Sequence, residues 1–165
     1  MLQRIEKRIA ENAQYGALML RLILGLVFVA HGYLAAFIYT PAGMTAFFGS
    51  LGIPFPALNA WALIGIHFAG GTMIALGLFT RINALVHGLV MLVAATTAHG
   101  AQGFFLNAVI VDAANNTAVV GGFEYALVLT VASLSLAFTG PGGLALDNFI
   151  ASASPAGRST SPAHS

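Results

Sequence analysis

The sequence contains no cysteine among its 165 residues. Without thiols the chain forms no disulfide, holds no cysteine-ligated iron–sulfur cluster and builds no thiolate zinc site. Thiol-based catalysis is excluded for the same reason. Any metal or redox chemistry in this protein therefore depends on other side chains.

Charged residues are also scarce. They make up 7% of the chain, against 58% hydrophobic residues, whereas a typical soluble domain carries about 25% charged residues. A soluble fold of this size could not cover its surface with so few charges, so the composition predicts an integral membrane protein. The net charge of +1 argues against nucleic acid as a partner.

Four apolar runs are long enough to cross a bilayer, which takes about 20 helical residues for about 30 Å of hydrocarbon. The runs are continuous rather than alternating, which favours helices over strands. We therefore predict an all-α membrane protein, a four-transmembrane-helix antiparallel bundle. Its spans are expected at about residues 17–39, 57–79, 82–99 and 121–139.

The first run is longer than the 7–15 residues of a signal-peptide core, so we expect it to be a retained span. Residues 1–16 carry basic side chains around an apolar face and predict a short interfacial helix before the 17–147 transmembrane domain. Residues 148–165 are rich in Ser, Pro and Ala, which predicts a disordered tail.

Two connections have distinct sequence signals. The stretch "TPAGMTAFFGSLGIPFP" contains three prolines and is interpreted as the break between the first two spans. The longest connection runs from Gly100 to Gly122 and has β-branched residues around a "DAANN" turn signal. That pattern predicts a small hairpin or a re-entrant flap.

The distribution of basic residues predicts the orientation. Antiparallel spans put the N-terminus, the "TRIN" turn at 80–83 and the C-terminal tail on one side of the membrane. All six basic residues lie on or near that side: Arg4, Lys7, Arg8, Arg21, Arg81 and Arg158. By the positive-inside rule this side is cytoplasmic. We expect a bacterial or archaeal cytoplasmic membrane protein with both termini inside.

The run "RLILGLVFVAHGYLAAF" contains an arginine and a histidine. At 1.5 Å per residue, Arg21 lies about 6 Å inside the cytoplasmic edge, where a long side chain can reach the headgroups. Arg21, Arg81 and His87 are therefore interpreted as a cytoplasmic-side anchor or as contacts to lipid or a partner. His31 lies in the outer half, where an imidazole is too short to reach water. An ionisable residue at that depth is a functional hypothesis.

His31 needs a polar neighbour, and the candidates at compatible depth are His67, His99 and Glu124. Four interpretations stay open. His31 and His67 could ligate haem b between facing helices, with nearby glycines leaving room for the macrocycle. His31, His67 and His99, with Glu124, could bind copper or another divalent metal. A quinone could accept a hydrogen bond from His31 or His67, with Glu124 passing protons. The histidines could also serve packing alone.

Several stretches occur in one order across about residues 18–147: "RLILGLVFVAHG", "AFFGSLGIPFPALNAW", "GGTMIALGLFTRINALV", "AHGAQGFF", "GFEYAL" and "LAFTGPGGLALD". Together they resemble the DoxX family of small membrane proteins. The resemblance implies four transmembrane helices and an association with respiratory or redox chemistry, since members are linked to a terminal quinol oxidase, to thiosulfate:quinone oxidoreduction and to oxidative-stress complexes. The positions that members usually share are matched by Arg21, His31, Gly32, Arg81, His99 and Glu124.

The chain departs from the family pattern at two places. Members often carry a lysine shortly after the His-Gly pair, where this chain reads "YLAAF", and a glutamate before the paired glycines, where it has His67. The absence of both the lysine and the glutamate fits the removal of an intramembrane ion pair, because losing only one of them would leave an unpaired charge in the membrane. A second mid-membrane imidazole stands there instead.

We therefore expect an accessory subunit of a quinone-linked redox or respiratory complex, at most an oxidoreductase subunit. Its surroundings would be the lipid bilayer and protein partners in a membrane redox complex. One alternative is a membrane subunit that binds haem b or a metal through His31 and His67. Another is a non-catalytic scaffold for the assembly or docking of partner proteins.

Overall fold

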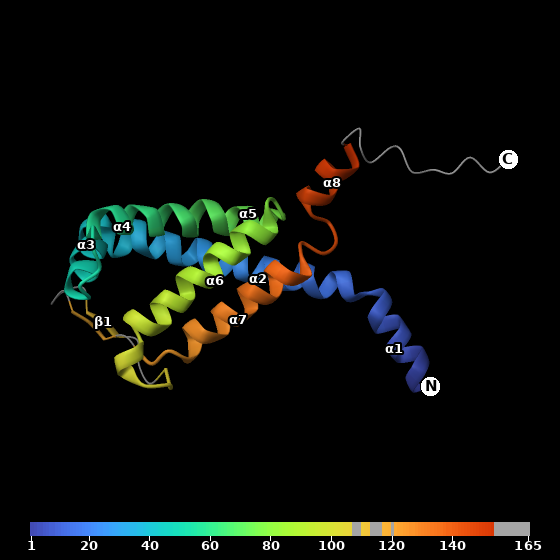
Figure 1. Ribbon diagram of the computed structural model, residues 1–165, viewed down its shortest axis with the longest axis horizontal. Helices are drawn as coiled ribbons and strands as arrows, with labels where there is room; N and C mark the ends of the chain where they lie inside the picture. The colour runs from blue at the N-terminus through green and yellow to red at the C-terminus, as the bar shows by residue number, and fades with distance from the viewer. Residues whose placement is uncertain (107–109, 113–116, 120, 154–165) are drawn as a thin grey trace.

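The computed structural model describes residues 1–106, 110–112, 117–119 and 121–153. Its helices confirm the predicted all-α membrane fold. Three are long and apolar enough to cross a bilayer, over Ala13–Ile38, Pro56–Leu76 and Thr80–Thr97, and a shorter apolar helix covers Glu124–Thr139. These four helices form the bundle (Figure 1).

The four spans are built from α-helical and π-helical segments. In chain order these are α2 (Ala13–Tyr33) with η1 (Leu34–Ile38), then α4 (Pro56–Gly65), η2 (Ile66–Gly70) and α5 (Gly71–Leu76), then α6 (Thr80–Thr97), then α7 (Glu124–Thr139). The segments η1 and η2 have the π-helical hydrogen-bonding pattern. Such a segment accommodates an extra residue in a helix and is common at functional sites.

The spans pack in two pairs. α2 lies along α5 and η2, and α6 lies along α7. The α6–α7 pair crosses the other pair obliquely in Figure 1. The largest fully buried apolar side chains are Phe28, Ile74 and Leu136, one each from α2, α5 and α7. Large apolar side chains remain exposed along all four spans, as expected for helices that face lipid.

Glycines let these helices approach closely. A Cβ at Gly25 would lie 2.6 Å from the Cβ of Ala75 across the α2–α5 contact. A Cβ at Gly71 would lie 2.9 Å from the Cβ of Phe28. Small residues at such contacts bring backbones together and increase packing between membrane helices.

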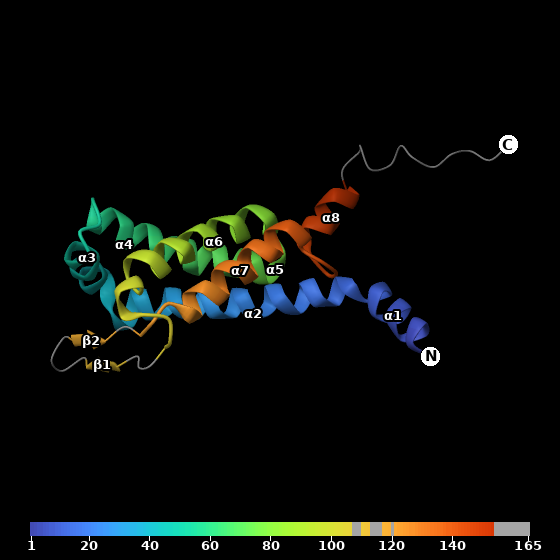
Figure 2. The ribbon, with the colours of Figure 1, turned by 60° about the horizontal axis from the view of Figure 1, so that its bottom comes forward.

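The two ends of the bundle carry different elements (Figures 1 and 2). The basic end has α1 (Leu2–Glu11), the α5–α6 turn and α8 (Leu146–Ala153). The hairpin end has α3 (Thr40–Ser50), the short helix η3 (Gly100–Gln102) and strands β1 (Ile110–Asp112) and β2 (Thr117–Val119). The strands pair antiparallel with Ile110 opposite Val119. This pairing confirms the predicted hairpin.

The connection between the first two spans is helical, which the prolines did not suggest. α3 begins at Thr40 with Pro41 in its first turn. Proline fits that position because a first-turn N–H has no partner within the helix. The stretch does join the first two spans, between Ile38 and Pro56, as predicted, and the helix within it is what the prolines did not reveal. The chain turns before this helix at Thr40, whose φ is 64°, and again after it, up to Phe55, whose φ is 51°.

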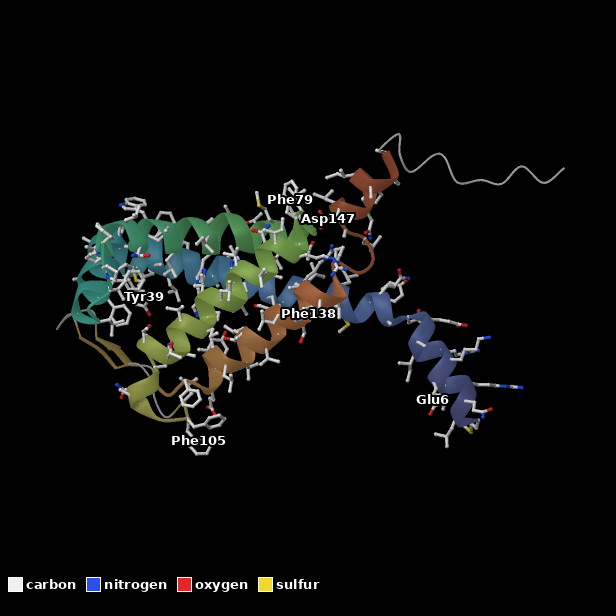
Figure 3. All side chains as sticks on the ribbon, viewed as in Figure 1. Glu6, Tyr39, Phe79, Phe105, Phe138 and Asp147 are labelled. Atoms are coloured by element: carbon white, nitrogen blue, oxygen red, sulfur yellow. The ribbon has the colours of Figure 1, made fainter. Side chains whose placement is uncertain are left out.

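Both terminal segments begin as helices. None of the residues of α1 is buried, and the helix projects away from the bundle, as the position of Glu6 in Figure 3 shows. α8 occupies residues up to Ala153, so it covers the start of the segment predicted as a disordered tail. Residues 154–165 of that segment lie outside the described residues.

Candidate functional site

Three imidazoles meet inside the bundle, and we call them the histidine row: His31 from α2, His67 from η2 and His87 from α6. The ring centroids of His67 and His87 are 5.4 Å apart with planes 16° apart, so the two rings stack. The ring centroids of His31 and His67 are 6.5 Å apart and nearly perpendicular at 84°. His67 is 5% exposed, His87 is 1% exposed and His31 is half-buried.

The neighbours of the row determine how its rings lie. Phe28 packs against His87 at 4.1 Å and against His67 at 5.3 Å between ring centroids. A Cβ at Gly70 would lie 2.7 Å from Cε1 of His87. Glycine is therefore the only residue at this position that leaves room for the His87 ring. The position lies about one helical turn from His67.

Two of the three rings have a defined hydrogen-bonding state. Nδ1 of His31 lies 2.8 Å from the carbonyl oxygen of Val27, and Nδ1 of His87 lies 2.7 Å from that of Asn83. A carbonyl oxygen only accepts, so each Nδ1 carries the hydrogen and donates it. Nε2 of a neutral imidazole in this state is a lone-pair acceptor.

Buried nitrogen atoms in the row are left without partners. Nδ1 of His67 and Nε2 of His87 have no hydrogen-bond partner within the described part of the chain. Each unsatisfied polar atom in an apolar interior costs about 1–3 kcal/mol. Packing alone does not require that cost, since an aromatic hydrocarbon ring would fill similar space. A ligand that completes these bonds would offset it.

The structure brings His31 and His67 together but places His99 and Glu124 elsewhere. Nδ1 of His99 lies 2.8 Å from the carbonyl oxygen of Gly121, and the Glu124 carboxylate accepts a 2.8 Å hydrogen bond from the backbone N–H of Leu106. Both side chains thereby fasten the connection at the hairpin end to the start of α7. These hydrogen bonds hold the loop in place and do not involve the histidine row.

Tyr125 is a neighbour of the row that sequence reasoning missed. Its ring stacks on His31 with centroids 6.1 Å apart and planes 25° apart, and it is 39% exposed. Tyr125 follows Glu124 at the start of α7. Tyr125 and half-buried His31 are the more exposed members of this group, since His67 and His87 are buried.

The structure places His87 against His67, whereas sequence reasoning grouped it with Arg21 and Arg81. Depth along a helix says nothing about which way a side chain points. A usable signal was present, because the buried face of α6 repeats at helical spacing through Ala84, His87, Gly88, Met91 and Ala95. His87 belongs to that face.

Both arginines bond to backbone carbonyls near the basic end. Arg21 is 2% exposed, and its Nη2 donates to the carbonyl of Leu144 at 2.5 Å. Its guanidinium occupies the space beside Gly77 that a Cβ would need. Arg81 donates to the carbonyls of Ala137 and Phe138 at 2.8 and 2.6 Å. A cation there suits the last turn of α7.

A macrocycle does not fit beside the row. Four of the five glycines that sequence reasoning regarded as room for haem, Gly25, Gly32, Gly70 and Gly71, lie against a facing helix, and a Cβ at Gly32 would come 2.8 Å from the backbone nitrogen of Phe68. His67 stacks on His87, and the rings of the two predicted haem ligands, His31 and His67, are nearly perpendicular at 84°. We therefore derive no chemistry through haem.

The proposed metal ligands do not converge either. Within the ranges that the structure describes, no group of three or more His, Cys, Asp or Glu side chains could hold a metal ion. His99 bonds Gly121 rather than joining His31 and His67. We derive no step through copper or another metal.

The fold and the row define a class: a multi-pass four-helix membrane protein with ionisable side chains in its interior. Comparison with protein families identifies the family within that class. The DoxX family matches residues 16–100, from the first span through the third. The chain belongs to the DoxX family, as the sequence resemblance implied.

One curated relative is similar over most of the chain. It is the candidate oxidoreductase CatD of Bacillus subtilis (strain 168), 34% identical over 140 residues, which cover 85% of this chain and 90% of the relative. A comparison with solved structures finds no significant match.

Proposed function

We propose that this protein is an accessory subunit of a quinone-linked redox or respiratory complex, and that the histidine row binds the quinone headgroup. The observation that carries the proposal is the pair of buried ring nitrogens without partners, on His67 and His87. A headgroup with polar oxygens on an aromatic ring supplies hydrogen bonds and apolar contact together. Its isoprenoid tail dissolves in the same bilayer that surrounds the helices.

The environment of the row suits such a ligand. Phe28 lies beside both buried imidazoles and Tyr125 stacks on His31, so aromatic faces surround the polar nitrogens. Small-molecule sites commonly combine an apolar lining with a few placed polar groups. Tyr125 is 39% exposed, so on this proposal the headgroup would enter from the lipid past Tyr125 and His31.

The chain itself supplies acid–base groups rather than electron carriers. Imidazole side chains can accept and donate protons, and the sequence has no cysteine to hold an iron–sulfur cluster. The two electrons of a bound quinol would therefore leave to a redox group of a partner subunit, while its two protons leave by way of the histidines. The name of the Bacillus relative, a candidate oxidoreductase, supports redox chemistry of this kind.

We also propose that the basic end faces the cytoplasm, so that both termini lie inside. Arg4, Lys7, Arg8, Arg21 and Arg81 all belong to that end, and residues 22–80 contain no Lys or Arg. The positive-inside rule supports this orientation in a cytoplasmic membrane.

The test is gentle purification of the protein from native membranes. An organic extract is analysed for quinone, the protein solution for its absorption spectrum and metal content, and the eluate for co-purifying subunits. We expect near-stoichiometric quinone with wild type and with Tyr33→Phe, a lipid-facing control on α2, and its loss with His31→Phe and His67→Phe. A Soret band that depends on His31 or His67, or stoichiometric copper, would contradict the proposal. Partner subunits that co-purify without quinone would favour the scaffold alternative.

A further inference from the structure

The histidine row has more hydrogen-bond acceptors than donors. Three neutral imidazoles carry three N–H groups and three lone pairs. The carbonyls of Val27 and Asn83 take the N–H groups of His31 and His87. One N–H, on His67, and three lone pairs are left for a ligand or for one another.

Even the best internal pairing leaves two lone pairs without a donor. If the remaining N–H of His67 donates to a neighbouring ring, two acceptors are still unmatched. The carbonyl of Ile66 lies near His87 outside hydrogen-bond geometry, and as an acceptor it could not satisfy a lone pair. The row therefore lacks two donors.

Within the described ranges, no side-chain donor bonds to a ring nitrogen of the row. The hydroxyl of Thr130 donates to the carbonyl of Ala126. The buried hydroxyl of Ser133 on α7 bonds to nothing, including the rings. Tyr125 stacks on His31 by its ring rather than donating its hydroxyl to Nε2. The missing donors have to come from the ligand.

The two redox forms of the ligand differ in this property. A quinone offers only carbonyl acceptors, so it could engage a single N–H in the row. The corresponding quinol carries two O–H donors on the same ring. A ligand with two donors complements a site that lacks two, whereas a ligand without donors leaves buried lone pairs unpaired.

We propose that the histidine row selects the reduced, hydroxyl-bearing form of its ligand, so that the protein binds quinol in preference to quinone. His31, the most accessible ring, receives the first hydroxyl at Nε2, and the buried rings receive the second. This proposal rests on the function proposed above, because it specifies which form of the ligand the same site holds.

The experiment measures dissociation constants under anaerobic conditions for three short-chain ligands that share one ring. They are the quinol, the quinone and the dimethyl ether of the quinol, which keeps the ring but has no O–H. Titrations of the purified protein in lipid nanodiscs follow the fluorescence of the single tryptophan, Trp61, and equilibrium dialysis checks them.

We expect the quinol to bind at least about tenfold more tightly than either the quinone or the ether, because only the quinol donates to the buried lone pairs. A tenfold preference raises the midpoint potential of the bound two-electron couple by about 30 mV. His31→Phe should abolish most of the difference between quinol and ether, whereas Tyr33→Phe should leave it unchanged.

The outcomes separate the two proposals. A quinone that binds as tightly as the quinol, or more tightly, would overturn the selection of the reduced form while a quinone site remained. An ether as tight as the quinol would overturn it too, since hydroxyl donation would then contribute nothing. Failure of all three ligands to bind would overturn both the selection and the proposed function. An unchanged preference in His31→Phe would contradict the assignment of Nε2 of His31 as the acceptor for the first hydroxyl.

Discussion

At the scale of single residues, the absent side chain of Gly70 decides whether the histidine row can form. A methyl group there would stand 2.7 Å from Cε1 of His87 and 3.2 Å from Oδ1 of Asn83. The His87 ring could not stay stacked on His67 and bonded to the Asn83 carbonyl. The contact between η2 and α6 and the site would be disturbed together.

Gly70→Ala should therefore lower the free energy of unfolding by about 1–3 kcal/mol, the usual cost of overpacking, and weaken ligand binding. Denaturation in detergent micelles measures the first effect. Gly65→Ala is the matched control in the same span, since a Cβ at Gly65 meets nothing within 4 Å. Equal losses in both variants would show that helix packing in general, rather than the contact with His87, is what Gly70 provides.

Replacing His67 by Phe separates stability from function. The substitution removes a buried nitrogen without a partner and keeps an aromatic ring beside Phe28, so we expect stability equal to or above that of wild type. His99→Phe should instead lose about 1 kcal/mol, because it leaves the carbonyl of Gly121 unpaired. Unfolding of both variants in the same detergent tests the contrast. A large loss with His67→Phe would indicate a structural role.

Sequence reasoning found part of the row, for a physical reason. Apolar runs show how deep each residue lies in the membrane. Depth alone singled out His31 and His67, because an ionisable side chain in the hydrocarbon is energetically unfavourable. Depth does not give rotation about the helix axis, so His87 was grouped with the arginines and Tyr125 was missed. The rotation depends on which helices pair and on the π-helical segment at Ile66–Gly70, which no local pattern revealed.

At the scale of helices and turns, α6 begins with a cap supplied from far along the chain. The carboxylate of Asp147 accepts hydrogen bonds from the backbone N–H groups of Phe79 and Thr80 at 2.7 and 2.9 Å, and from the Thr80 hydroxyl at 2.8 Å. Figure 3 shows Asp147 beside Phe79. A carboxylate at a helix N-terminus satisfies free N–H groups and complements the helix dipole.

Asp147→Asn should therefore lower stability by about 1–2 kcal/mol, since an amide has one acceptor oxygen where the carboxylate uses both. It should also expose the start of α8 to proteolysis. Glu6→Gln makes the same chemical change on α1, which has no buried residue, and should have no measurable effect. Thermal denaturation of the two variants, and limited chymotrypsin digestion, which can cut after Leu146 and Phe149, test this cap. Identical behaviour would mean that Asp147 does not hold α8 to the bundle.

Helix positions were largely predictable, because about 20 apolar residues in a row have few alternatives in lipid. α3 was not predictable in the same way, since a proline in a first turn and a proline in a break look alike from sequence. The cap by Asp147 was hidden too, because its partners lie 67 and 68 residues away in the chain.

At the scale of the whole molecule, the two ends differ in charge and in structure. α1 and α8 share the basic end, and α3 shares the hairpin end with β1 and β2 (Figure 2). All five basic residues of the described segments belong to the basic end. By the positive-inside rule this asymmetry predicts that the basic end faces the cytoplasm.

The lack of native cysteine makes the orientation simple to test. A membrane-impermeant maleimide added to intact cells should label Ser50→Cys on α3 and should label Ser152→Cys on α8 only after the membrane is opened. Both serines are exposed, so accessibility of the side chain does not limit either reaction. The reverse pattern would place the basic end outside.

The most direct test of the histidine row as a ligand site is the shift in melting temperature that a quinol produces. A ligand at 100 times its dissociation constant stabilises the folded state by about 2.7 kcal/mol, so wild type should melt several degrees higher with quinol than without. His67→Phe should melt at or above the ligand-free wild-type temperature and show no shift. An equal shift in His67→Phe, or none in wild type at saturating quinol, would contradict the assignment of the row as the binding site.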